Sequence, residues 1–146
     1  MTRDLFVGTW KLISSEMRTS TGESFYPLGK DCAGILTLDS AGHLSAHLMR
    51  LGRPDFTSGD ILRGTDDEIK TAYQGYIAFW GNYKIDESKR EMTYSVEGSL
   101  FPNWVGHENL RYYEFTDDRQ ALTLRTPPFL AAGKEIVGLL IWQRIG

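Results

Sequence analysis

The sequence has only one cysteine, Cys32, so no internal disulfide can form. A chain with a lone thiol fits a reducing compartment. The first residues also lack the apolar run of a secretory signal, because Asp4 and Lys11 interrupt it. No stretch approaches the roughly 18 apolar residues that a membrane-spanning helix needs. We therefore expect a cytoplasmic protein that does not contact membranes.

Basic residues are too few for a nucleic-acid-binding protein. The 16 lysines and arginines are outnumbered by 19 aspartates and glutamates, which gives a formal net charge of −3. Nucleic acids and anionic membrane surfaces are bound through concentrated positive patches. We therefore expect neither kind of partner.

Sequence motifs of the common enzyme classes are also missing. The chain contains no Gly-x-Ser-x-Gly, no His-Glu-x-x-His and no Gly-x-Gly-x-x-Gly. Its three histidines are His43, His47 and His107. His43 and His47 would lie two pleats apart on one strand face, too far apart to bind one ion together. The sequence predicts neither a metal nor a cofactor.

What the chain does contain is a series of strand-like segments. Its 146 residues are 41% hydrophobic and 24% charged, as is typical of one globular domain. Runs rich in β-branched and aromatic residues, separated by turn signals, predict strands. Eight such runs are Phe6–Thr19, Gly34–Leu38, His43–Met49, Asn82–Asp86, Glu91–Glu97, His107–Phe115, Ala121–Thr126 and Glu135–Ile145. We interpret residues 1–146 as a single all-β domain.

One α-helix, near Thr65–Trp80, is predicted between the third and fourth of these strands. Thr65 and Glu68 have the spacing of a capping box, in which each side chain accepts a hydrogen bond from a free backbone N–H. Apolar residues at helical spacing predict a stripe packed on the core: Ile69, Ala72, Tyr73 and Tyr76. Gly81 is predicted to end the helix.

Short strands at regular spacing predict an eight-stranded antiparallel barrel, which leaves no open sheet edge. Closure requires the first and last strands to pair. Trp10 and Arg144 could then stack, a contact worth roughly 0.5–2 kcal/mol. A barrel of eight strands is just wide enough to hold one small ligand.

Several motifs in the chain form a recognisable set. They are Gly8–Leu12, Gly34–Thr37, Asp39–Ala46, Ser99–Gly106 (Ser-Leu-Phe-Pro-Asn-Trp-Val-Gly), Leu110–Tyr112 and Leu122–Leu124. Together they resemble the bacterial and fungal lipocalin-like domain family along nearly the whole chain. The resemblance implies an eight-stranded barrel with a helix between early strands, often encoded among secondary-metabolite genes. That family often has a histidine in the strand before the Phe-Pro-Asn-Trp loop. Tyr94 and Ser95 stand there in this chain, so the role of that histidine is not carried over.

Strand alternation selects the candidate site residues. If Glu108 and Glu114 face water, Arg111 and its alternate neighbours face the barrel interior. The predicted ligand-binding residues are Tyr83, Trp104, Asn109, Tyr113, Phe115, Leu124 and Trp142. Such a lining suits a flat, mostly apolar molecule with one or two oxygens.

Two functions fit these residues. The first is a barrel that binds a small, mostly apolar metabolite, polyketide- or terpenoid-like, in its interior. The alternative is a cofactor-independent cyclase or isomerase of secondary metabolism that uses the same pocket. In it, a cation or hydroxyl stabilises enolate charge and another group moves a proton. The predicted catalytic residues are Arg111, Tyr94 and His47.

Structural explanations for these residues remain open as well. Arg111 could pair with Glu16 or Glu97, because a buried charge needs a partner. The interior tyrosines could be core residues whose hydroxyls bond each other. A purely structural domain and a homodimer are also left open.

Overall fold

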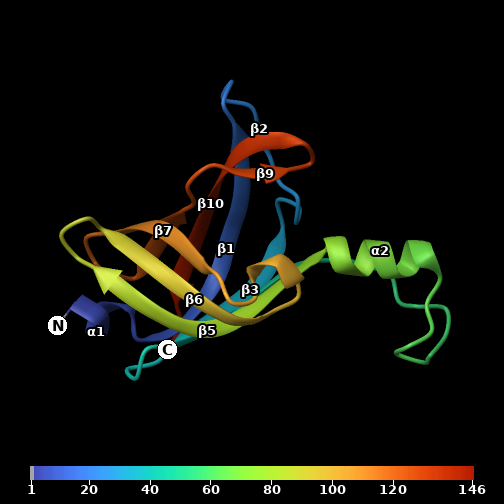
Figure 1. Ribbon diagram of the computed structural model, residues 1–146, viewed down its shortest axis with the longest axis horizontal. Coiled ribbons are helices and arrows are strands. Elements are labelled where there is room, and N and C mark those ends of the chain that lie inside the picture. The colour runs from blue at the N-terminus through green and yellow to red at the C-terminus, as the bar shows by residue number, and fades with distance from the viewer. Residues whose placement is uncertain (1) are drawn as a thin grey trace.

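A closed antiparallel barrel forms the body of the protein. The computed structural model describes residues 2–146. Within this range eight strands follow one another around the barrel, and the last pairs with the first (Figure 1). They are β1 Gly8–Thr19, β3 Cys32–Leu38, β4 His43–Arg50, β5 Tyr76–Asp86, β6 Glu91–Ser99, β7 Glu108–Phe115, β8 Ala121–Arg125 and β10 Lys134–Arg144. The predicted eight-stranded antiparallel barrel is confirmed, and the chain is mostly β.

Two short strands at one end of the barrel were not predicted. Strand β2, Ser24–Phe25, pairs with β1, and β9, Phe129–Ala131, pairs with β10. Both lie beyond the main ring of strands (Figure 1). They extend two long neighbouring strands without altering the closure.

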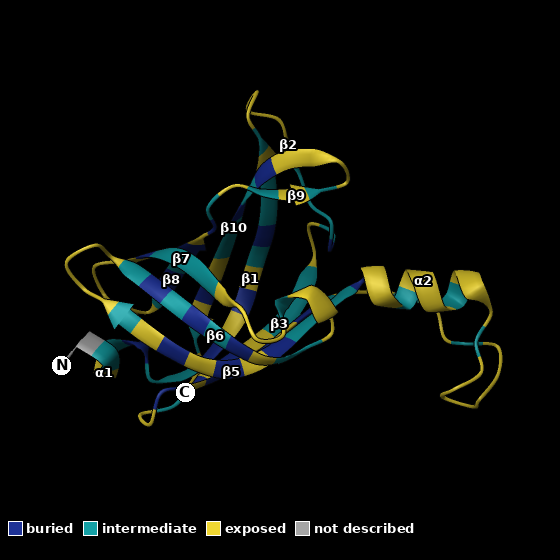
Figure 2. Ribbon diagram, in the orientation of Figure 1, coloured by how far each residue is buried: buried dark blue, intermediate teal, exposed yellow. Residues whose placement is uncertain are grey.

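Alternating burial along the strands places the core inside the barrel. In β4, Leu44, Ala46 and Leu48 are buried, whereas His43 and His47 are exposed. The same alternation runs along the other strands (Figure 2). Because successive side chains point to opposite faces, the apolar face of each strand turns inward.

The two ends of the chain meet where β1 pairs with β10, as predicted. Trp10 and Arg144 are register partners, and the guanidinium carbon lies 4.3 Å from the centroid of the indole ring. The Trp10 Nε1 donates to the Phe6 carbonyl at 2.9 Å, and the Arg144 Nη1 donates to the Val7 carbonyl at 2.8 Å. This stacking and hydrogen bonding hold the barrel closed.

The segment before β1 is a short helix, α1, Thr2–Phe6, where the sequence predicted the start of a strand at Phe6. Phe6 is completely buried, and its ring lies 4.8 Å from the rings of Tyr113 and Phe115, edge to face. Burial of this aromatic ring outweighs its strand propensity. The helix therefore closes one end of the barrel.

The predicted helix exists, but its position among the strands and its length were wrong. Helix α2, Asp66–Gln74, lies between β4 and β5, which are the fourth and fifth strands along the chain and not the third and fourth, because the short β2 precedes them. Its capping box is present, and Gly75, not Gly81, ends it. Residues 76–80 begin β5, because Ala46 of β4 pairs with Phe79. Strand pairing has overridden helical spacing there.

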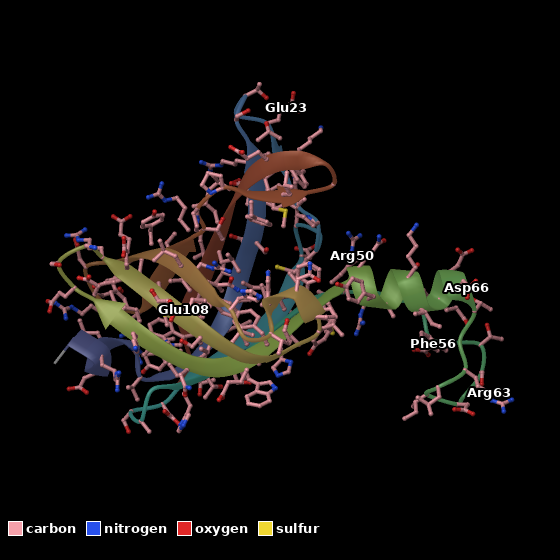
Figure 3. The ribbon with its side chains drawn as sticks, in the orientation of Figure 1. Glu23, Arg50, Phe56, Arg63, Asp66 and Glu108 are labelled. Atoms are coloured by element: carbon pink, nitrogen blue, oxygen red, sulfur yellow. The ribbon has the colours of Figure 1, made fainter. Side chains whose placement is uncertain are left out.

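Helix α2 projects away from the barrel, and no residue of it is buried (Figures 1 and 3). Ile69 and Tyr73 are 50% and 43% exposed, so the prediction that their stripe packs on the core was wrong. Arg53 joins the helix to the barrel by donating to the Ala72 carbonyl at 3.1 Å and by stacking on Tyr76. No helix in residues 2–146 is long and apolar enough to span a membrane.

We predict that acid loosens the start of α2. Glu68 accepts hydrogen bonds from the backbone N–H groups of Thr57 and Thr65, which lower its pKa from 4.5 to about 2. A carboxyl whose folded pKa is depressed stabilises the fold above its unfolded pKa, and this contribution is lost as the pH falls through the folded value. NMR titration should therefore show Glu68 titrating near pH 2, with the protection of the Thr57 and Thr65 amides against hydrogen exchange decreasing as the pH falls from 4.5 toward 2. An ordinary titration near 4.5 would contradict the capping geometry.

Candidate functional site

A cavity of about 390 Å³ opens into the barrel. Its lining includes Met17, which pairs with β2, and Phe129 of β9, whereas Phe6 of α1 is not among the lining residues. Its apolar walls are Leu36, Leu48, Phe79, Trp104, Leu124 and Leu140. Volumes of a few hundred cubic ångströms, walled mostly by apolar groups, are typical of small-molecule sites.

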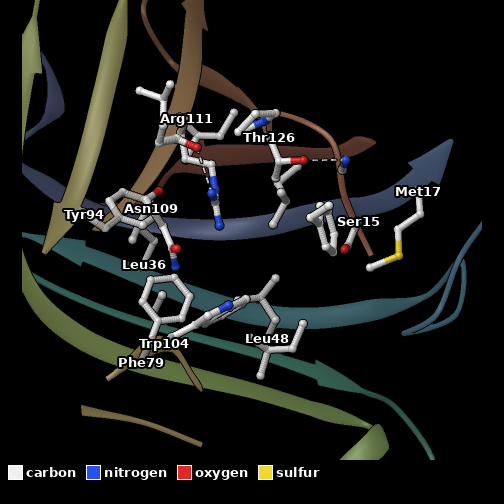
Figure 4. Close-up of a pocket in the computed structure, with 18 of the residues that line it drawn as sticks. Ser15, Met17, Leu36, Leu48, Phe79, Tyr94, Trp104, Asn109, Arg111 and Thr126 are labelled. Atoms are coloured by element: carbon white, nitrogen blue, oxygen red, sulfur yellow. Dashed lines mark hydrogen bonds between the residues drawn. The ribbon is translucent and has the colours of Figure 1, made fainter. Parts of the chain in front are cut away.

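Arg111 of β7 extends into this cavity (Figure 4). Its Nη1 donates to the neighbouring Leu110 carbonyl at 2.8 Å, and its guanidinium carbon lies 5.3 Å from the centroid of the Tyr94 ring. Burial lowers the pKa of Arg111, but a guanidinium remains charged at neutral pH. The site therefore contains a partly buried cation.

Arg111 has no carboxylate partner among residues 2–146. Glu16 accepts from Arg18 Nε at 2.7 Å and from the Tyr26 hydroxyl at 3.3 Å, and Glu97 is exposed. No ion pair in the part of the chain that the structure describes includes Arg111. The structural explanation that Arg111 pairs with Glu16 or Glu97 is therefore not realised.

Two further polar groups at the cavity are buried without a hydrogen-bond partner in residues 2–146. They are Asn109 Nδ2 and Trp142 Nε1. Both atoms are donors, and a buried donor without an acceptor costs free energy. Asn109 lies on the same strand as Arg111, and the two side chains point into the same space (Figure 4). The cavity wall therefore holds two buried donors that have no acceptor among the described residues.

Tyr94 lines the cavity from β6, next to Arg111. Burial raises the pKa of Tyr94 to about 12, against which the Arg111 charge acts in the opposite direction. Its hydroxyl is therefore protonated at neutral pH and can donate a hydrogen bond. Six predicted site residues thus share the cavity: Tyr94, Trp104, Asn109, Arg111, Leu124 and Trp142.

The other predicted site residues lie elsewhere. Tyr113 and Phe115 pack on Phe6 at the end closed by α1. Tyr83 donates its hydroxyl hydrogen to the Asp39 carbonyl at 2.7 Å and does not line the cavity. His47 is exposed on the outer face of β4, where its Nδ1 lies 3.1 Å from the Tyr76 hydroxyl. The sheet separates this imidazole from the cavity.

Sequence reasoning missed several wall residues, among them Phe79 and Thr126. Phe79 could have been identified from strand alternation, in which it shares a face with Ile77, Gly81, Tyr83 and Ile85. The sequence instead predicted residues 76–80 as part of the helix, so Phe79 was not assigned to the site. Thr126 is the last residue of a predicted strand, and no role at the site was predicted for it. Its hydroxyl accepts from Gly138 N at 2.8 Å and so joins β8 to β10 at the cavity wall (Figure 4).

Comparisons with known proteins agree with this architecture. The model of a lipocalin-like domain family matches residues 7–145. The 4'-hydroxy-3'-methoxypropiophenone carrier protein of Aspergillus oryzae (strain ATCC 42149 / RIB 40) is 30% identical over 108 residues. That alignment covers 70% of this chain and 96% of the Aspergillus protein. The chain belongs to the lipocalin-like domain family.

Proposed function

We propose that this protein binds a small, mostly apolar aromatic metabolite in its barrel and carries it without chemical change. One observation carries the proposal: an apolar cavity of about 390 Å³ has Arg111 in its lining, together with two residues that hold unpartnered donors, Asn109 Nδ2 and Trp142 Nε1. Apolar walls supply affinity, and a few convergent polar groups supply orientation. An aromatic ring that bears acceptor oxygens complements both.

The relative supports this choice of ligand class. Its name identifies a carrier of an aryl ketone with hydroxyl and methoxy substituents. Such a molecule is flat and largely apolar, and its polar atoms are mainly oxygen acceptors. These properties match the apolar walls and the donors around Arg111 in this chain.

We favour a carrier over the cyclase or isomerase because the groups predicted to move a proton, Tyr94 and His47, are poorly suited to that role. A general base works best when its pKa lies near the working pH. The pKa of Tyr94 is raised to about 12, and His47 lies on the outer face of the barrel. Neither group suits proton abstraction from a molecule in the cavity.

We predict that the purified protein binds 4'-hydroxy-3'-methoxypropiophenone in a 1:1 complex, measured by isothermal titration calorimetry. Ala46→Phe should remove this binding, because Ala46 lines the cavity and a phenyl ring there would occupy the ligand's space. Ser45→Phe is the matched control, because Ser45 alternates with Ala46 on β4 and points outward. This control should bind like the parent protein.

Chromatography of the ligand recovered from the complex distinguishes carriage from catalysis. An unchanged ligand, recovered in stoichiometric amount, is the expected result. Conversion of the ligand during incubation would favour the isomerase alternative. If Ala46→Phe binds the ligand as tightly as the parent protein does, the cavity is not the binding site.

A further inference from the structure

The polar side-chain groups of Arg111, Asn109 and Trp142 at the cavity offer a ligand mainly hydrogen-bond donors. A guanidinium has five N–H donors and no acceptor. One protein hydrogen bond of the Arg111 guanidinium is present, that to the Leu110 carbonyl. The unpartnered Asn109 Nδ2 and Trp142 Nε1 add further donors. A ligand atom that binds the free N–H groups of the guanidinium must be an acceptor.

The charges around Arg111 leave its positive charge uncompensated. The titratable residues lining the cavity are Glu16 on β1, Tyr94 on β6, and Glu108 and Arg111 on β7. Tyr94 is neutral, Glu16 is held by Arg18, and Glu108 is exposed to water. In residues 2–146 no carboxylate lies within 4.0 Å of a nitrogen of Arg111. A partly buried cation without a counter-ion carries a desolvation cost, and a bound anion would reduce that cost.

We propose that the carried ligand is an acidic phenol or enol that binds as its anion, with the negative oxygen at Arg111. This inference rests on the proposed function and specifies the ionisation state of the ligand. The phenol or enol O–H bond breaks, the electron pair stays on the oxygen, and the proton leaves to solvent. The neutral Tyr94 side chain lines the cavity beside Arg111, with the guanidinium carbon 5.3 Å from its ring centroid.

The physical reason is that a nearby cation and donors favour the charged form of an acid. A phenol with an acyl group in the para position is suited to this effect, because the ring spreads the negative charge into the ketone oxygen. The charge then extends along a flat, apolar molecule, which lowers the cost of placing it between walls such as Phe79 and Leu124. A charge-assisted hydrogen bond to the oxygen is stronger than a neutral one.

The test compares two ligands that differ only at the ionisable oxygen. 4'-Hydroxy-3'-methoxypropiophenone can lose its phenolic proton, whereas 3',4'-dimethoxypropiophenone cannot. Phenolate absorbs at longer wavelength than phenol, so the absorption spectrum reports the state of the bound ligand. We expect the phenolate spectrum in the complex at a pH where the free compound is still protonated. The phenol should bind about 10- to 100-fold more tightly than its methyl ether.

The pH dependence of binding follows from the same chemistry. Below the pKa of the free phenol, binding of the anion releases one proton, so affinity should rise with pH by up to about tenfold per unit. Above that pKa the affinity should be constant. The methyl ether releases no proton and should show no such slope.

Arg111→Met should remove both the spectral shift and the pH slope, and it should weaken binding of the phenol far more than binding of the methyl ether. Arg125→Met is the matched control, because Arg125 is exposed and stacks on Tyr112 with its guanidinium carbon 5.0 Å from the ring centroid, outside the cavity. Arg111→Lys keeps the positive charge and should retain part of the shift. It also provides a second test if the methionine variant does not fold.

The outcomes separate this inference from the proposed function. Equal affinities for the phenol and its methyl ether, with no phenolate spectrum, would overturn anion binding but leave the carrier intact. A phenolate spectrum that persists in Arg111→Met would also overturn it. Failure of both compounds to bind would remove the proposed function and this inference together.

Discussion

Replacing Trp10 with alanine is expected to lower the free energy of unfolding by roughly 3–5 kcal/mol. The indole is completely buried in the core, and its Nε1 donates to the Phe6 carbonyl at 2.9 Å. Its ring also faces the guanidinium of Arg144 on the last strand at 4.3 Å. The substitution therefore leaves a cavity and breaks the stacking where the barrel closes. Urea denaturation followed by circular dichroism measures the loss.

Trp80→Ala is the matched control for this prediction. Trp80 is 55% exposed on the outer face of β5, so its removal makes no interior cavity. We expect a loss of less than about 1 kcal/mol, as for most surface substitutions. If Trp10→Ala and Trp80→Ala unfold at the same urea concentration as the parent, the contact between β1 and β10 does not stabilise the barrel.

The closure of the barrel could be predicted because it depends on local patterns. Alternating residues and turn signals define most strands, and an even number of antiparallel strands without exposed edges suggests a barrel. Pairing of the first and last strands then brings Trp10 and Arg144 together, as the structure shows. The resemblance to the lipocalin-like family added the same architecture independently.

The segment between β4 and β5 could not be predicted from local patterns. Residues 76–80 continue the helical spacing of α2, yet they pair with β4. The free energy of that pairing comes from a strand about 30 positions earlier in the chain, which helix propensity does not include. The short strands β2 and β9 have two and three residues, too few for alternation to be recognised.

The sequence could predict which side chains of the candidate site face the barrel interior, but not how far along the barrel axis each side chain lies. Alternation correctly turned Asn109, Arg111 and Tyr113 toward the interior. Alternation carries no information about position along the barrel axis, however. Tyr113 meets Phe6 at the closed end, whereas Arg111, two residues earlier, reaches the cavity. The helix α1 that decides this was not foreseen.

The absence of a carboxylate partner for Arg111 is the feature of the site that was hardest to predict from the sequence. Glu16 and Glu97 both lie on strands of the barrel, and either was a reasonable counter-ion. The structure pairs Glu16 with Arg18 and exposes Glu97. This pairing depends on side-chain rotamers, which strand periodicity does not determine.

A second large effect is expected at Gly81, where the sequence suggested a helix end. Gly81 is buried in β5, at the point where the β5–β6 register shifts between Trp80 and Gly81. A Cβ there would overlap the carbonyl oxygen of Ser95 and approach the Glu97 nitrogen to 3.0 Å. Both atoms belong to the backbone of β6 and cannot rotate away. Glycine within a strand often marks such a bulge or close backbone approach.

Gly81→Ala should therefore destabilise the protein by roughly 1–3 kcal/mol or more, because overpacking against a backbone forces the strands apart. Gly59→Ala is the matched control, since a Cβ at Gly59 meets no atom within 4 Å and the backbone there does not require glycine. The control should melt within a few degrees of the parent. Because Phe79 of the cavity wall lies two residues before Gly81, the alanine variant should also bind the ligand more weakly. Parent-like stability in Gly81→Ala would mean that β5 and β6 can separate at this bulge without loss, contrary to the close packing of their backbones.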